Sequence, residues 1–401
     1  MTTDKPAGTV KQGAAGVFYT FLKLGFTSFG GPVAHLGYFR KELVERRGWV
    51  SDSQFGQLLA ICQFLPGPAS SQLGFVLGLL RGGWPGALAA FLGFTLPSAL
   101  LLLLFAALLP YLSGPIGLAA IHGLKLVACA VVADAVLGMF LKLCPDLPRR
   151  IIAVAAAGLL LLAGSAWLQL LVVLGGALAG LALCRTAAEE RSDLIHPGYG
   201  KRFALTLLGV FAVLLLLFLA LPAERGLFAL AEAFYSAGAL VFGGGHVVLP
   251  LLEESVVASG WVAQESFLAG YGASQAIPGP MFAFSAYLGA LVPTGFPAWL
   301  GGAVALVFIF LPGFLLVAAV LPLWQAISRY RPTANAIVGV NAAVVGLLGA
   351  AFYDPILTSG IASVADLAVA VSAFLMLRYA HLSPLIIVVW CVSGGLLTSL
   401  L

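Results

Sequence analysis

The residues best suited to do chemistry in this chain lie beside two glycine- and proline-rich breaks, and this pair of breaks occurs twice. Phe29-Gly30-Gly31-Pro32 is followed by Pro66-Gly67-Pro68, and Phe242-Gly243-Gly244-Gly245 is followed at nearly the same spacing by Pro278-Gly279-Pro280. All four breaks lie in strongly apolar sequence. A helix can be broken inside a bilayer only where protein or a water-filled cavity satisfies the freed backbone groups. The pattern is typical of a secondary transporter whose site lies at the interface of two repeats.

Each break also predicts the start of a new helix. Pro32, Pro68 and Pro280 each follow a glycine directly, and proline is favoured at the first position of a helix. The free N–H groups of a helix N-terminus make a ready anion site. Each N-terminus carries roughly +0.5 charge, so four together supply roughly +2, which matches a dianion. This interpretation requires the helix C-termini of the same hairpins to point elsewhere or to bind a cation.

Side chains next to the breaks add hydrogen-bond donors. Gln63 precedes Pro66-Gly67-Pro68, and Ser70, Ser71 and Gln72 follow it. Gln275 precedes the second such break, but Met281 and Phe282 take the places of the two serines. The N-terminal half is therefore predicted to contribute more to binding.

Lys125 lies within the apolar segment 115–141, close to the predicted middle of the bilayer. A cation at this depth is costly and is functional by default. An ion pair with Asp134 is the alternative, but the spacing places the two residues on opposite helix faces. His35, His122 and His246 lie near candidate sites, where a histidine is either a proton carrier or an ordinary buried group.

These arguments define one predicted substrate-binding set and no catalytic or metal-binding residue. The set is Gly30, Gly31, Pro32, His35, Gln63, Pro66, Gly67, Pro68, Ser70, Ser71, Gln72, Lys125, Gly243, Gly244, Gly245, His246, Gln275, Pro278, Gly279 and Pro280.

The composition indicates the class of protein that carries these residues. The chain has 401 residues, of which 61% are hydrophobic and 9% are charged, whereas soluble domains average about 25% charged residues. Long Leu/Ala/Val runs exclude a β-barrel and predict an all-α polytopic membrane protein. The five cysteines are scattered, so they support neither a disulfide framework nor a zinc site. Basic patches interleaved with aromatic residues, the pattern of nucleic-acid binding, are absent.

The two halves of the chain align with one another. Trp49 aligns with Trp261, Gln63 with Gln275, Pro97 with Pro312 and Gly123 with Gly339. The alignment predicts an N-terminal transport repeat at 1–184, a cytoplasmic linker at 185–202, a connecting transmembrane helix at 203–221 and a C-terminal repeat at 222–401. The connecting helix has no counterpart in the first half, so it inverts the second repeat.

Basic residues distinguish two topologies. If all thirteen apolar segments span the membrane, thirteen Lys and Arg residues lie on the N-terminal side and five on the other. If the four broken segments are re-entrant hairpins, the ratio becomes seventeen to one. Because positive residues concentrate on the cytoplasmic side, both versions place the N-terminus in the cytoplasm and the C-terminus outside. The second version, with nine full spans and four hairpins, is the better fit.

At these residues the chain resembles the chromate ion transporters, in their long two-domain form. The resemblance is carried by Phe29-Gly30-Gly31-Pro32-x-Ala34-His35, by Gln63-x-x-Pro66-Gly67-Pro68-x-x-x-Gln72 and by Leu96-Pro97-Ser98, together with the weaker second copies of the first two motifs. It implies efflux of chromate across the bacterial inner membrane, with sulfate as a chemical mimic. Gly245 stands where the first half has Pro32, and the second half lacks an equivalent of His35.

The sequence therefore predicts a secondary active transporter that exports chromate, driven by the membrane potential, a proton gradient or both. Uptake or exchange of sulfate or another anion is the alternative within transport. An intramembrane enzyme acting on a phosphorylated lipid is the alternative of another class, although no cluster of carboxylates or nucleophiles supports it. No ATP-binding motif is present and no cofactor is expected. The expected partners are chromate, sulfate as a competitor and the lipid bilayer, without nucleic acid, and a homodimer remains open.

Overall fold

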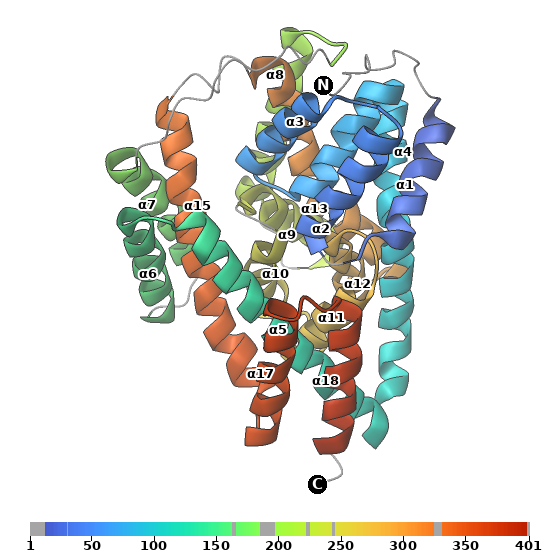
Figure 1. The fold of residues 1–401 in the computed structure, drawn as a ribbon, viewed down its shortest axis with the longest axis vertical. Helices are drawn as coiled ribbons and strands as arrows, with labels where there is room; N and C mark the ends of the chain where they lie inside the picture. Colours follow the sequence, from blue (N-terminus) through green and yellow to red (C-terminus); the bar gives the residue numbers. More distant parts are fainter. Residues whose placement is uncertain are drawn as a thin grey trace.

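The computed structural model describes residues 13–29, 31–162, 166–184, 197–221, 225–242, 245–324 and 331–398, and every regular element within them is helical (Figure 1). The prediction of an all-α polytopic fold is therefore confirmed. The elements of the first half are α1 (Ala14–Thr27), α2 (Gly31–Phe39), η1 (Arg40–Arg46), α3 (Asp52–Phe64), α4 (Ala69–Leu108), η2 (Leu109–Leu112), α5 (Pro115–Leu143), α6 (Leu147–Leu162) and α7 (Ala166–Leu183).

The helix α8 (Lys201–Ala220) connects the first half to the second. The elements that follow are α9 (Gly226–Leu240), η3 (Gly245–Val247), α10 (Val248–Val256), α11 (Gln264–Ala276), η4 (Met281–Ala283), α12 (Phe284–Leu291), α13 (Ala298–Val320), η5 (Leu321–Leu323), α15 (Arg331–Ala351), η6 (Phe352–Leu357), α16 (Thr358–Gly360), α17 (Val364–Arg378) and α18 (Pro384–Thr398). The division of the chain at 184, 202 and 221 stays a prediction, and residues 185–196 of the linker lie outside the described residues.

The broken segments form short helices that turn back at each break. The helices α1, α3, α9 and α11 have 13 to 15 residues, fewer than the roughly 20 needed to cross a bilayer. The long helix α4 is itself interrupted at Gly82 and Gly83, where φ reaches +64°. Its first part closes a hairpin with α3, and its second part is long enough to span. These lengths agree with the re-entrant version of the topology.

Five of the described helices are long and apolar enough to span a membrane. They are the segments Ala69–Leu112, Pro115–Leu143, Lys201–Ala220, Ala298–Leu323 and Pro332–Gly360. The other four predicted spans correspond to α6, α7, α17 and α18, which have 15 to 18 residues. Of the nine spans predicted, the structure supports five by length alone.

The breaks of the two halves are hydrogen-bonded to each other. The backbone N–H of Gly67 donates to the carbonyl of Val241 at 2.7 Å, and the N–H of Gly279 donates to the carbonyl of Ser28 at 3.0 Å. Gly67 aligns with Gly279, and Ser28 aligns with Val241, so the two bonds are equivalent. Both glycines have positive φ, +117° and +108°, which residues with a side chain rarely adopt. The internal repeat is therefore visible in the fold as two equivalent hydrogen bonds between the halves. We call these two bonds, Gly67 to Val241 and Gly279 to Ser28, the crossed bonds.

The last two helices of each half pack on a long helix of the other half. The helix α5 contacts α17 and α18, whereas α15 contacts α6 and α7. Glycines permit both close approaches: a Cβ on Gly123 would lie 2.5 Å from the Cα of Val392, and a Cβ on Gly339 would overlap the carbonyl of Gly176. Gly123 and Gly339 are aligned residues, so this exchange of helices also repeats.

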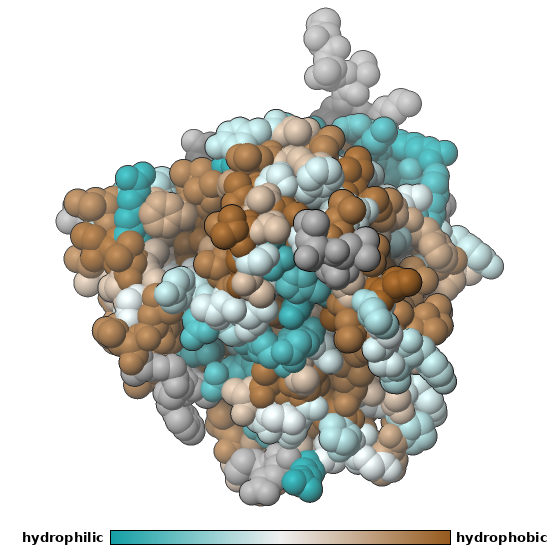
Figure 2. Space-filling view, turned by 90° about the horizontal axis from the view of Figure 1, so that it is seen from below, coloured by the Kyte–Doolittle hydropathy of each residue, from teal (hydrophilic) through white to brown (hydrophobic). Residues whose placement is uncertain are grey.

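The arrangement in space agrees with an inverted pair of repeats. In Figure 1, α1, α2 and α3 lie in the upper part of the molecule, whereas α10, α11 and α12 lie lower and α17 and α18 reach the lower end. Seen from below, Figure 2 shows hydrophilic residues gathered near the middle of this end and hydrophobic residues around them. The second part of α4 exposes a leucine every fourth residue from Leu88 to Leu108, a stripe suited to contact lipid.

We expect Gly123→Ala to lower the free energy of unfolding by about 1–3 kcal/mol, because the added methyl group overlaps the backbone of α18. The thermal unfolding midpoint in detergent measures this effect. Gly209→Ala is the matched control, since nothing lies within 4 Å of a Cβ at this position on α8. An equal loss of stability in both variants would contradict the proposed close packing.

Candidate functional site

A cavity of about 470 Å³ lies between the two halves at the breaks. Both halves contribute to its wall. The lining residues are Leu36, Cys62, Gln63, Leu65, Gly67, Pro68, Ala69, Ser70, Ser71, Asp134, Ala135, Gly138, Met139, Lys142, Leu143, Gly245, His246, Pro280, Met281, Phe282, Asn341 and Arg378.

Three helix N-termini meet at this cavity. The first residues of α4, of η3 and of η4 all lie in its wall. Because each of these segments begins after a break, its first N–H groups have no partner within the helix. Each PGP break ends in a proline, Pro68 or Pro280, directly before the helix. Proline has no N–H group and so donates no backbone hydrogen bond. The convergence of such ends is the arrangement that favours a bound anion.

Polar side chains supplement these backbone groups. Gln63, Ser70 and Ser71 reach the cavity from α3 and α4, as the sequence predicted. The hydroxyl of Ser71 and the side-chain oxygen of Asn341 are buried without a hydrogen-bond partner. His246 also lines the cavity, and its Nδ1 lies 2.7 Å from the hydroxyl of Tyr271. Among the residues that the structure describes, the Ser71 hydroxyl is thus a donor, and the Asn341 oxygen an acceptor, without a protein partner.

Three charged residues in the wall were not among the predicted site residues. Asp134 and Lys142 come from α5, and Arg378 comes from the last turn of α17. Nη1 of Arg378 lies 3.6 Å from Oδ1 of Asp134. The rule that flagged Lys125 as an intramembrane charge also applies to Asp134 on the same helix. Arg378 is one of the thirteen basic residues that the sequence predicts on the cytoplasmic side, and the packing of α17 against α5 brings it to the cavity.

Several predicted residues support the cavity from outside its wall. Gln72 donates from Nε2 to the carbonyls of Pro66 at 2.9 Å and Gly313 at 3.0 Å, so it ties the first PGP break to α13. Gly279 donates its N–H in the crossed bonds. Gln275 donates to the carbonyl of Tyr271 and to the hydroxyl of Ser274. Pro66 and Pro278 also lie outside the cavity wall.

His35 and the first break lie deeper in the N-terminal half. The ring of His35 is buried and packs edge-on against Phe94. Gly31 and Pro32 form the first turn of α2. Gly30, Gly243 and Gly244 lie outside the described residues.

Lys125 does not line this cavity. Asn341, the residue aligned with Lys125, does line the cavity. The two residues differ in this way because the two halves pack differently around them. Gly272 of α11 packs directly against the carbonyl of Leu124 on α5, which closes the side of α5 next to Lys125. The aligned helices α3 and α15 instead face each other across the cavity through Gln63 and Asn341. Near Lys125, His122 and Asp366 form a pair at 2.8 Å that joins α5 to α17.

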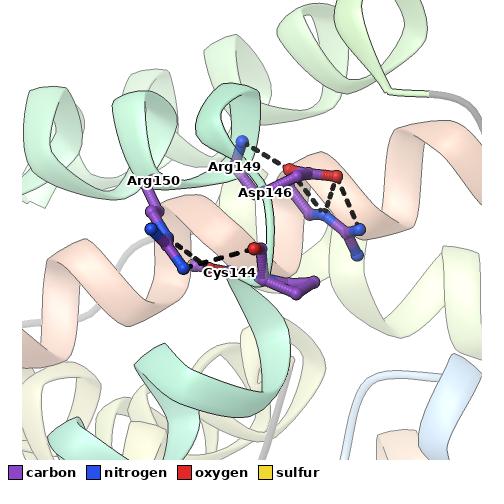
Figure 3. Close-up of polar contacts among 5 residues, drawn as sticks. Cys144, Asp146, Arg149 and Arg150 are labelled. Atoms are coloured by element: carbon purple, nitrogen blue, oxygen red, sulfur yellow. Dashed lines mark hydrogen bonds and ion pairs between the residues drawn. The ribbon is translucent and has the colours of Figure 1, made fainter.

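The turn between α5 and α6 fixes the end of the helix that carries Asp134 and Lys142 (Figure 3). Arg149 donates from Nη2 to Oδ2 of Asp146 at 2.7 Å, and Arg150 donates from Nε to the carbonyl of Cys144 at 3.1 Å. The bond from Arg150 satisfies the carbonyl of Cys144, the residue that ends α5, whereas the Arg149–Asp146 bond joins two side chains at the start of α6. The hydrogen bond from Arg149 also lowers the pKa of the Asp146 carboxyl.

A second pocket of about 340 Å³ is acidic. Its wall includes Glu253 and Glu254 of α10 and Asp354 of η6, together with Gln169 and Gln264. This pocket therefore holds three carboxylates, whereas the cavity at the breaks holds two cations, Lys142 and Arg378, and the carboxylate of Asp134.

Comparison with known proteins assigns a family to this architecture. The family model described as chromate transporter matches residues 15–181 and again 228–397, so one description fits both halves. The chain belongs to the chromate transporter family.

Individual members of the family match over most of their length. A chromate transport protein of Pseudomonas aeruginosa is 31% identical over 95% of this chain and 90% of its own. A probable chromate transport protein of Synechococcus elongatus is 31% identical over 86% of this chain and 84% of its own, and a chromate transport protein of Cupriavidus metallidurans is 28% identical over 94% and 91%. No solved structure matches this chain.

We expect Gly67→Ala to abolish the uptake of chromate into membrane vesicles that contain the protein. At φ of +117° an alanine is strained, and its Cβ would lie 3.1 Å from the Cα of Gly313, so the break and the N-terminus of α4 must shift. Gly56→Ala on α3 is the control, because its Cβ has nothing within 4 Å. Wild-type rates in Gly67→Ala, at equal expression, would exclude this break from the site.

Proposed function

We propose that this protein is a secondary active transporter that exports chromate across the bacterial inner membrane. One observation supports the proposal above the others: N-termini from both halves, at α4, η3 and η4, line one cavity that also holds Lys142 and Arg378. Chromate is a tetrahedral dianion, and helix N-termini with flanking cations bind such anions. The names of the relatives agree with this substrate.

The membrane potential is sufficient to drive export. Moving one charge across 100 mV is worth about 2.3 kcal/mol, so a dianion that leaves a negative interior gains roughly twice that amount. A proton gradient is an additional source. Sulfate has the same charge and shape, so we expect it to compete, and its uptake or exchange is the alternative that the same cavity supports. The cavity favours transport over an intramembrane lipid enzyme, because Asp134 is the one carboxylate among the described residues of its wall.

The difference between the halves supports alternating access. In the structure α11 is packed on α5 while α3 and α15 are separated by the cavity. If the two repeats exchange conformations, α3 closes on α15 and α11 opens from α5. Lys125 then takes the place that Asn341 holds now and contacts the substrate in the oppositely open state. The N-terminus is proposed to lie in the cytoplasm and the C-terminus outside.

Inverted vesicles test the function directly. With the cytoplasmic face outward, they should accumulate chromate without ATP when the interior of the vesicle is positive, and excess sulfate should slow the uptake. Vesicles with Pro66, Gly67 and Pro68 all replaced by alanine, at equal expression, are the control. If wild-type vesicles accumulate no more chromate than this control, export of chromate is refuted.

Thiol labelling tests the exchange of conformations. In a background without the five native cysteines, Asn341→Cys should react with a hydrophilic thiol reagent in the resting protein. Lys125→Cys should react only when chromate and a membrane potential drive turnover, whereas Leu126→Cys, which is fully buried, should stay unlabelled. A disulfide between Ala60→Cys and Val340→Cys, the counterparts of the Gly272–Leu124 contact, should form only during turnover. Equal labelling of Lys125→Cys at rest would contradict the proposal.

A further inference from the structure

We infer that Arg378 binds the substrate oxyanion directly and that Asp134 is the internal counter-ion which the substrate displaces. The inference rests on the proposed function of the cavity and names two residues in it. Both line the cavity, and their side chains are 31% and 35% exposed. They come from different halves of the chain, α5 and α17.

The pair is held by charge and not by a hydrogen bond. Nη1 of Arg378 and Oδ1 of Asp134 are 3.6 Å apart, and Oδ1 of Asp134 is buried and accepts no hydrogen bond. In the Arg149–Asp146 pair, by contrast, both carboxylate oxygens accept hydrogen bonds, one of them at 2.7 Å. Asp134 therefore accepts no hydrogen bond from the N–H groups of Arg378.

A tetrahedral oxyanion uses that fork better than Asp134 does. Guanidinium groups bind oxyanions through two parallel N–H···O bonds, which are shorter and stronger than a purely Coulombic contact. An oxyanion in the cavity is free to adopt this geometry, whereas the carboxylate of Asp134 is fixed on a packed helix. The loose pair thus keeps Arg378 oriented in the empty cavity without holding it firmly.

The charges of the cavity wall agree with the displacement of Asp134 from Arg378 by a bound oxyanion. Lys142 and Arg378 contribute two positive charges and Asp134 one negative charge, and His246 is the other ionisable side chain in the wall apart from Cys62. With His246 neutral the net charge is one positive charge, so a bound dianion is only partly compensated. Removing the charge of Asp134 leaves two positive charges, equal and opposite to a dianion. Asp134 therefore weakens binding and allows release.

The experiment measures chromate and sulfate binding to purified protein, along with KM and maximal rate in vesicles. Arg378→Gln should weaken binding and raise KM by about tenfold or more, the size expected for one lost charge-assisted contact. Arg378→Lys keeps the charge but loses the fork, so it should fall between Arg378→Gln and wild type. Asp134→Asn should strengthen binding of the dianion, lower KM and slow the maximal rate, with a smaller effect on a tetrahedral monoanion such as perchlorate.

The double variant separates this mechanism from a structural ion pair. In Asp134→Asn with Arg378→Gln, the gain in binding from Asp134→Asn should be smaller than in the wild-type background, because only the effect of wall charge remains once Arg378 is gone. Arg40→Gln and Asp52→Asn are the matched control, because this exposed pair, 2.8 Å apart, lies outside the cavity wall and should leave binding unchanged. If Asp134→Asn weakens binding as Arg378→Gln does, or if Arg378→Gln leaves binding unchanged, the inference is overturned. Failure of wild-type vesicles to export chromate would instead refute the proposed function, since binding to purified protein does not depend on direction.

Discussion

The need to satisfy every backbone amide inside a bilayer controls this fold. A broken helix exposes N–H and C=O groups to a solvent that cannot bind them, at a cost of several kcal/mol each. The protein meets this need by setting the breaks of one half against those of the other. The N–H of Gly67 donates to Val241, and the N–H of Gly279 donates to Ser28. The helix N-termini next to these bonds are then left facing a cavity, where an anion is the natural partner.

The long helices, like the breaks, make their contacts with the opposite half of the chain. The helix α5 is packed against α17 and α18, and α15 is packed against α6 and α7, so neither half completes its own core. Separation of the two halves as rigid bodies would expose both sets of glycine contacts. The packing differs between the halves at the contact of α11 with α5 and at the gap between α3 and α15. These are the places at which we propose that access to the cavity changes.

Local sequence patterns predicted the breaks and the residues beside them, because glycine and proline act on the backbone where they stand. Gln63, Ser70 and Ser71 reach the cavity for this reason. The alignment matched each break with its counterpart in the other half, but it did not predict that each PGP break bonds to the other kind of break in the opposite half. Gln72, by contrast, was predicted to bind substrate, yet its amide is used to hold Pro66 and Gly313.

The charged part of the cavity depends on packing between distant segments and was missed. Arg378 is far from Asp134 in the chain, and nothing near it in sequence marks it as part of a site. Lys125 was predicted from its depth in the membrane. Depth indicates the free-energy cost of burying a charge, but it does not indicate which face of the helix borders a cavity. In the structure Gly272 of α11 packs on the side of α5 next to Lys125, and no pattern near Lys125 in the sequence indicates that contact.

The crossed bonds are made entirely by backbone atoms, and this has a consequence for how the two halves diverged. A carbonyl group is present whatever the side chain, so position 28 holds serine and position 241 holds valine while the bond at each is kept. The only fixed requirement is glycine at 67 and 279. The two halves can therefore carry different side chains beside their breaks, hydroxyl groups at Ser70 and Ser71 and apolar groups at Met281 and Phe282, while the same backbone bonds hold both.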